Sequence, residues 1–139
     1  MRLGISLIRR AHRSGENVGV DRTVLIVDDH APFRRMARRL LEAAGFCVVG
    51  EAGDGVSALA AAAALGPDVV LLDVLLPDMD GFAVARCLAE RPCGPVVVLT
   101  SSRSEPELGR RLEQAPAAGF IAKDALSAAA LARFGEAQQ

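Results

Sequence analysis

Carboxylate side chains stand at two points of this 139-residue sequence, and each point directly follows a run of apolar residues. Asp28 and Asp29 follow the run TVLIV, and Asp73 follows the run VVLL. One aspartate after an apolar run is more often a helix cap or a turn residue than a reactive group. Three carboxylates at one place would repel one another strongly. Mg²⁺, which prefers carboxylate and carbonyl oxygens and recruits phosphate oxygens, would relieve that repulsion.

Two further apolar runs are followed directly by a polar side chain. The hydroxyl of Thr100 follows the run VVVL, and the ammonium of Lys123 follows the run GFIA. Lys123 is the only lysine in the chain, and every other residue among its 16 Lys and Arg is arginine. Lysine carries a compact point charge on a flexible stem, which the planar fork of arginine does not reproduce. Taken alone, Lys123 could be an ordinary surface lysine. Beside the three carboxylates, Thr100 and Lys123 would complete a cradle for a phosphoryl group.

Short apolar strands must position these side chains. The runs at 23–27, 69–73 and 96–99 show no polar alternation, which is typical of strands covered on both faces of a parallel sheet. Two more strands are expected at 46–50 and 119–122. Helices are expected between them, at 32–44, 56–65, 82–90 and 127–134, with a short or irregular helix in the segment 103–118. The alternation predicts an α/β fold, a doubly wound five-stranded parallel sheet whose strands end at one crevice.

Composition and charge limit the classes of function. With 51% hydrophobic residues the chain can fold around a core, and no apolar run approaches the roughly 20 residues that a membrane-spanning helix needs. The net charge of -1 gives no general attraction to nucleic acids or anionic membranes. No helix-turn-helix segment follows the sheet, so direct nucleic acid binding is not expected.

The ends of the chain differ in charge. Residues 1–22 hold five arginines against Glu16 and Asp21. We therefore expect residues 1–21 to be a flexible basic extension and residues 22–139 to be a single domain. An odd number of cysteines, three, without metal-type spacing or a secretion signal predicts reduced thiols and a cytoplasmic location.

Four motifs, in their order and spacing, resemble the receiver domain of two-component response regulators. They are VLIVDDH at 24–30, LLDVLLPDMDG at 71–81, VVLTSS at 97–102 and GFIAKD at 119–124. The resemblance covers the chain from Thr23 to about Phe134. It implies a flavodoxin-like sheet of strand order 2-1-3-4-5, in a stand-alone, single-domain receiver. It also implies a phosphorelay switch that works in the cytoplasm and is not a turnover enzyme.

The resemblance assigns a role to each of the reactive groups. Asp73 would be the phosphoacceptor, whose carboxylate attacks a phosphohistidine of a sensor histidine kinase or phosphotransfer protein to give an aspartyl-phosphate. Mg²⁺ would be bound by Asp29, Asp73 and the backbone carbonyl of Leu75, with Asp28 acting mainly through water. Leu75 is apolar at a position that influences self-dephosphorylation in this family. A slow loss of the phosphoryl group is therefore expected.

The resemblance also implies how the switch is read. Thr100 and Lys123 would bind the phosphoryl group, and Phe120 occupies the position of an aromatic switch residue. The surface formed by the fourth helix, the fifth strand and the fifth helix would then contact an unknown downstream protein. A homodimer through the last helix and strand is also possible.

Two other classes of function remain open. The first is a receiver-fold scaffold that works without phosphorylation, and the intact set of site residues argues against it. The second is a small phosphate-handling enzyme or a flavin protein. The two carboxylates after the first strand would repel a flavin phosphate, and leucine at position 75 does not supply the second acid of an Asp-x-Asp phosphatase.

Overall fold

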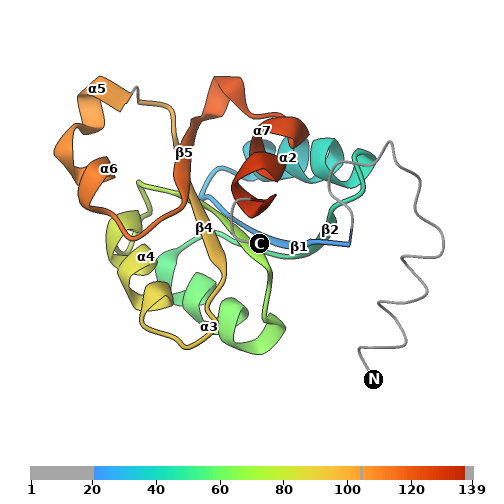
Figure 1. Cartoon of the computed structure of the whole chain (residues 1–139), viewed down its shortest axis with the longest axis horizontal. Coiled ribbons are helices and arrows are strands. Elements are labelled where there is room, and N and C mark those ends of the chain that lie inside the picture. The colour runs from blue at the N-terminus through green and yellow to red at the C-terminus, as the bar shows by residue number, and fades with distance from the viewer. Residues whose placement is uncertain (1–20, 104, 137–139) are drawn as a thin grey trace.

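A parallel sheet of five strands, in the order β2-β1-β3-β4-β5, organises the chain (Figure 1). The computed structural model describes residues 21–103 and 105–136. Apart from Asp21, the predicted N-terminal extension lies outside these residues. The strands are β1 (Thr23–Val27), β2 (Cys47–Ala52), β3 (Val69–Asp73), β4 (Val96–Ser101) and β5 (Gly119–Ala122). The predicted fold class and strand order are thereby confirmed.

Helices cover both faces of this sheet (Figure 1). They are α2 (Ala31–Ala43), α3 (Gly55–Leu65), α4 (Gly81–Ala89), α5 (Glu105–Leu108), α6 (Arg110–Gln114) and α7 (Ala128–Glu136), with a 3₁₀ turn η1 (Lys123–Ala125) after β5. The helices α2 and α7 pack on one face, and α3 and α4 pack on the other. The predicted helices are present, with ends that differ by one or two residues.

The unbroken apolar runs are explained by these two layers. In β3, Val70 and Leu72 pack on the face of α3 and α4, whereas Val69 and Leu71 pack on the face of α2 and α7. All five residues of β3 are buried, so successive side chains enter different cores and neither face is polar. Among the described residues, no helix is long and apolar enough to cross a membrane.

Local sequence signals set where the helices begin and end. Asp54 caps α3 by accepting a hydrogen bond from the Ser57 backbone N–H at 2.7 Å. Gly66 ends α3 in the left-handed conformation, with φ of 57°. Asp80 caps α4 through the Phe82 backbone N–H at 2.8 Å.

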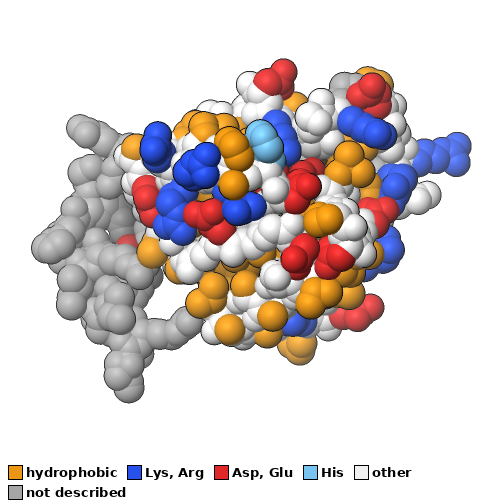
Figure 2. Space-filling view, turned by 180° about the vertical axis from the view of Figure 1, so that it is seen from behind, with side chains coloured by type: hydrophobic (Ala, Val, Ile, Leu, Met, Phe, Trp, Pro, Cys, Tyr) orange, Lys and Arg blue, Asp and Glu red, His pale blue; other side chains and the backbone are white. Residues whose placement is uncertain are grey.

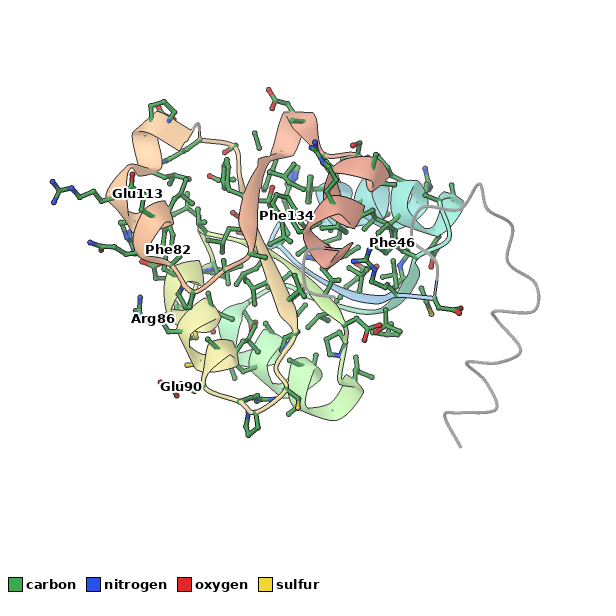
Figure 3. The ribbon with its side chains drawn as sticks, in the orientation of Figure 1. Phe46, Phe82, Arg86, Glu90, Glu113 and Phe134 are labelled. Carbon is green, nitrogen blue, oxygen red and sulfur yellow. The ribbon has the colours of Figure 1, made fainter. Side chains whose placement is uncertain are left out.

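The predicted irregular segment is divided into α5 and α6 by Gly109, which has φ of 57°. No side chain of α6 is buried. Instead, Arg111 of α6 forms an ion pair with Asp80, and its guanidinium lies over the ring of Phe82, 4.3 Å from the ring centroid. Figure 3 shows Phe82 on the side of the molecule where α4 and α6 lie. The segment is therefore held by contacts to the start of α4 and by Leu108 and Leu112, which pack half-buried against the core of α3 and α4.

Arginines on α2 are interleaved with acidic side chains on the face seen in Figure 2. Arg34 and Arg38 both form ion pairs with Glu51 of β2, at 3.0 and 2.7 Å, and Arg38 also pairs with Glu42 at 3.0 Å. The hydrogen bond from Arg38 is the main reason that the pKa of the Glu51 carboxyl is lowered. This surface has the mixed charges of an ordinary solvated helix face.

Candidate functional site

The three predicted carboxylates meet at the carboxyl ends of β1 and β3. One oxygen from each of Asp28, Asp29 and Asp73 lies within 4.8 Å of the others. The parallel register pairs Val27 of β1 with Leu72 of β3, which brings the next residue of each strand to the same edge. Asp28 and Asp73 are buried, with exposed fractions of 0% and 4%, whereas Asp29 is exposed. The sheet therefore builds an acidic pocket that is open on the side of Asp29.

Lys123 reaches this pocket from the end of β5. Its Nζ lies 2.7 Å from Asp28 Oδ2 and 3.2 Å from Asp73 Oδ2. The pairing of β3 with β4 and of β4 with β5 places the end of β5 within reach of the two carboxylates. One ammonium beside three carboxylates leaves the pocket with a formal charge of -2.

Burial and neighbouring charges both shift the pKa values of Asp73 and Lys123. Burial raises the pKa of the Asp73 carboxyl above its ordinary value, and the like charge of Asp28 adds to this rise. The Leu75 backbone N–H and Lys123 oppose the rise without cancelling it. For Lys123, burial favours the neutral amine, but the pairing with Asp28 and Asp73 outweighs it and raises the pKa of the ammonium. Lys123 therefore remains a cation beside a carboxylate that is poorly stabilised as an anion.

This donor set fits a hard divalent cation. It offers carboxylate oxygens, the ligands that Mg²⁺ prefers, from three residues at one edge of the sheet. The formal charge of -2 equals in size the charge that such an ion would bring. The predicted grouping of Asp28, Asp29 and Asp73 is thus present, and the identity of the ion is taken up under the proposed function.

The backbone around Asp73 is tightly fixed. The Leu75 N–H donates a hydrogen bond to Asp73 Oδ1 at 3.1 Å, and the Leu75 side chain is 52% exposed. Gly81 begins α4, and a Cβ on it would lie 2.3 Å from the Asp73 carbonyl oxygen and 2.6 Å from the Val74 Cα. Only glycine lets the start of α4 lie this close to the residue after β3.

Thr100 lies next to Asp73 in the sheet, because the register of β3 and β4 pairs the two residues. Its exposed fraction is 0%, and its Oγ1 has no hydrogen-bond partner within residues 21–103 and 105–136. A buried hydroxyl without a partner is costly and uncommon in folded proteins. The polar group is therefore available to a ligand of the pocket.

Phe120 lies on β5, half-buried against the core of α3 and α4. It lines a cavity of about 240 Å³ between the sheet and α6, together with Leu99, Leu112, Glu113, Ala117 and Gly119. The predicted switch residue is thus separated from the acidic pocket by β4 and lies beneath the irregular segment.

Phe33 in the site and Asp78 in the loop that follows β3 had no role in the sequence analysis. Phe33, in the first turn of α2, places its ring 4.8 Å from Lys123 Nζ. Asp78 accepts hydrogen bonds from the backbone N–H groups of Gly55 at 2.7 Å and Val56 at 3.0 Å, at the start of α3. The position of Phe33 soon after Asp29, at the start of a helix that follows a strand end, was the available signal. No local sequence pattern indicated that Asp78 would accept hydrogen bonds from Gly55 and Val56.

Known proteins are similar to this chain over most of its length. The family model described as "Response regulator receiver domain" matches residues 24–133. A probable transcriptional regulatory protein, NarL from Mycobacterium tuberculosis, is 42% identical over 102 residues, which are 73% of this chain and 47% of the relative. Protein-glutamate methylesterase/protein-glutamine glutaminase 5 from Myxococcus xanthus is 44% identical over 102 residues, 72% of this chain and 29% of the relative.

The solved structures agree with these matches. The signal receiver domain of the putative response regulator NarL from Mycobacterium tuberculosis superposes with a TM-score of 0.77 at 36% identity. That match covers 84% of this chain and 97% of the solved domain. A CheY-like receiver domain from Methylobacillus flagellatus gives a TM-score of 0.73 at 26% identity, over 86% of this chain and 99% of that one. The chain spans about half of the regulator and less than a third of the methylesterase, so the similarity concerns one shared domain.

Proposed function

Because this chain belongs to the family of response regulator receiver domains, we propose that it accepts a phosphoryl group on Asp73. The donor is a sensor histidine kinase or a phosphotransfer protein. The carboxylate of Asp73 attacks phosphorus, an O–P bond forms, and the P–N bond to the donor histidine breaks. The observation that carries this proposal is the position of Asp73 at the end of β3, with Asp28, Asp29 and Lys123 around it.

Asp28, Asp29 and Asp73 would hold Mg²⁺, together with the backbone carbonyl of Leu75. The donor chemistry and the formal charge of the pocket support this assignment. When bound there, Mg²⁺ supplies neutralisation of the negative charge on the phosphoryl group. Lys123, which lies beside Asp28 and Asp73, adds a second positive charge, and its ammonium would pair with a phosphoryl oxygen. The Thr100 hydroxyl donates a hydrogen bond to another.

Phosphorylation would change a surface of the protein that lies away from the pocket. Thr100 is on β4, between Asp73 on one side and β5 with Phe120 on the other. A movement of Thr100 toward the phosphoryl group frees space into which the Phe120 ring turns. The surface of α5, α6, β5 and α7 then changes its affinity for a downstream protein or for a second copy of the chain. The protein works as a switch in the cytoplasm and not as a turnover enzyme.

Incubation of the full chain with a small phosphodonor and Mg²⁺, followed by intact-mass measurement, tests the acceptor. We expect a phosphate-sized gain in mass for the wild-type protein and none for Asp73→Asn. The isosteric amide keeps the fold while removing the nucleophile. A gain of equal size in Asp73→Asn would show that another residue accepts the group. No gain in the wild type would leave the phosphorylation-independent scaffold as the better explanation.

The lifetime of the phosphoryl group depends on Leu75. Its side chain is half exposed beside Asp73 and has no polar atom that could orient an attacking water molecule. We therefore expect slow hydrolysis of the aspartyl-phosphate, and faster hydrolysis in Leu75→Asn, whose amide can hold a water. Removing the phosphodonor and following the decay of the phosphorylated mass measures both rates. Loss from the wild type within seconds would contradict this expectation.

A further inference from the structure

The ammonium of Lys123 has an aromatic neighbour as well as two acidic ones. The ring centroid of Phe33 lies 4.8 Å from Nζ, within the distance at which a cation is attracted to the face of a ring. Phe33 belongs to the first turn of α2, and Lys123 begins the turn η1 after β5. Two elements that are distant in sequence thus meet at this contact.

The surroundings of the contact make it strong for its type. The exposed fraction of Phe33 is 8%, and the side chains of Asp28 and Asp73 are 0% and 6% exposed. The Lys123 side chain is itself only 20% exposed. Attraction between a cation and a ring increases when water is excluded, because water no longer competes for the cation. The ammonium is therefore held by three partners that are each almost fully covered.

The ring differs from the carboxylates in one respect that matters for phosphorylation. Asp28 and Asp73 are groups that a hard cation would engage through their oxygens, whereas a phenyl ring offers such a cation no ligand. Phosphorylation would also consume one of the Asp73 oxygens. Phe33 is thus the neighbour of Nζ that neither metal binding nor phosphorylation would engage directly.

We propose that Phe33 is a positioning residue that holds the Lys123 ammonium at the edge of the acidic pocket, ready to meet the incoming phosphoryl group. This inference rests on the proposed function and adds Phe33 to the residues that support it. The ring orients the lysine side chain and takes no part in bond formation.

Phe33 is also part of the core on the α2 and α7 face, and that role must be separated from positioning. Phe46 provides a matched control in the same core. It is 3% exposed, and its ring lies 5.8 Å from the guanidinium of Arg22 at the start of β1, not near the pocket. Figure 3 shows Phe46 at the end of the molecule opposite Phe82. Phe46→Leu and Phe33→Leu therefore remove similar rings from one core, and only Phe33→Leu removes the contact with Lys123.

Because Lys123 is the only lysine in the chain, lysine labelled with ¹³C at Cε gives one side-chain signal in an NMR spectrum of the full protein. Protons above the face of a phenyl ring are shifted upfield. We expect upfield Hε signals in the wild type and in Phe46→Leu, and signals near the values of a free lysine side chain in Phe33→Leu. Equal signals in all three proteins would overturn the proposal.

The consequence for phosphorylation is tested with phenylalanines at position 33 that carry an increasing number of fluorine atoms. Fluorine withdraws electron density from the ring face and weakens its attraction for a cation, with little change in ring size. We expect the rate of phosphorylation by a small phosphodonor to fall steadily along the series, by about three- to tenfold in total. A purely structural role would leave the rate unchanged.

The outcomes separate this inference from the proposed function. Normal phosphorylation of the wild type together with a flat fluorination series overturns the positioning role alone. A wild-type chain that is not phosphorylated on Asp73 overturns the proposed function, and the positioning role with it. A steady fall along the series, with Phe46→Leu phosphorylated at the wild-type rate, supports both.

Discussion

Thr100 has a buried hydroxyl with no partner among the described residues, which supports the binding role that we propose for it. Its Oγ1 is covered, and within residues 21–103 and 105–136 nothing bonds to it. An unsatisfied buried polar group costs about 1–3 kcal/mol of stability. Valine has nearly the same shape and lacks the hydroxyl. The fold by itself would therefore accept valine at this position at least as well as threonine.

We expect Thr100→Val to leave the free energy of unfolding unchanged or to raise it by up to about 1–3 kcal/mol, because the unpaired hydroxyl is removed. Urea unfolding without phosphodonor measures this change. Thr23→Val is the matched control, since the Thr23 hydroxyl accepts a hydrogen bond from the Asp68 N–H at 2.9 Å and donates one to Asp68 Oδ2 at 3.1 Å. We expect Thr23→Val to lower the free energy of unfolding by about 1 kcal/mol. An equal decrease in the free energy of unfolding for Thr100→Val would mean that the Thr100 hydroxyl has a hydrogen-bond partner in the unphosphorylated protein.

The loop between β3 and α4 connects the pocket to three helices. Asp78 bonds to the start of α3, and Asp80 caps α4. Asp80 also pairs with Arg111 of α6. The residues just after Asp73 therefore contact α3, α4 and the irregular segment together. A displacement of this loop would therefore be transmitted to α3, α4 and α6.

The Asp78 cap gives the start of α3 a dependence on pH. Hydrogen bonds from the Gly55 and Val56 N–H groups hold the pKa of the Asp78 carboxyl below its ordinary value. A lowered folded-state pKa means that the stabilisation is present above the unfolded pKa and is lost as the pH falls through the folded one. We expect the urea midpoint of the wild type to fall more steeply below about pH 4 than that of Asp78→Asn.

Measuring the urea midpoints from neutral to acidic pH tests this expectation. Glu90→Gln is a suitable control, because Glu90 is exposed at the end of α4 and its side chain forms no ion pair with the described residues. Its curve should run parallel to that of the wild type. Parallel curves for Asp78→Asn and the wild type would show that the cap does not contribute to acid sensitivity.

Element positions followed well from the sequence, because the signals that set them are local. Apolar runs without alternation identified β1, β3 and β4, and a short or irregular helix was expected at 103–118, where the structure has α5 and α6. The roles of Phe33 and Asp78 could not be obtained in the same way. Phe33 has the spacing of a core residue on α2, which it also is. The partners of Asp78 lie 22 and 23 positions away, on a helix whose orientation only the folded sheet defines.

At the scale of the whole molecule, one hydrogen bond joins the beginning of the sheet to the last helix. Arg22 donates through Nη2 to the Ala132 carbonyl oxygen at 3.0 Å, across 110 positions of sequence. The pocket residues all lie between Asp28 and Lys123. We therefore propose that the domain starts at residue 22, and that residues 1–21 are a separate basic extension.

A chain that begins at Arg22 should be phosphorylated by a small donor at the same rate as the full chain. The contacts that build the pocket among the described residues all lie between Asp28 and Lys123, and this chain retains them. Arg22→Ala in the full chain should lower the free energy of unfolding by about 1 kcal/mol, because the bond to α7 is lost. A shortened chain that is phosphorylated more slowly would place part of the site in the first 21 residues.

The close approach at Gly81 has a consequence for how this domain tolerates genetic change. A Cβ there would overlap the backbone of Asp73 and Val74, which cannot rotate aside as a side chain can. Every single-base missense change in a glycine codon introduces a Cβ. Position 81 is therefore a point at which random variation is harmful whatever the chemistry of the new residue, although glycine has no side chain that could take part in the chemistry of the site.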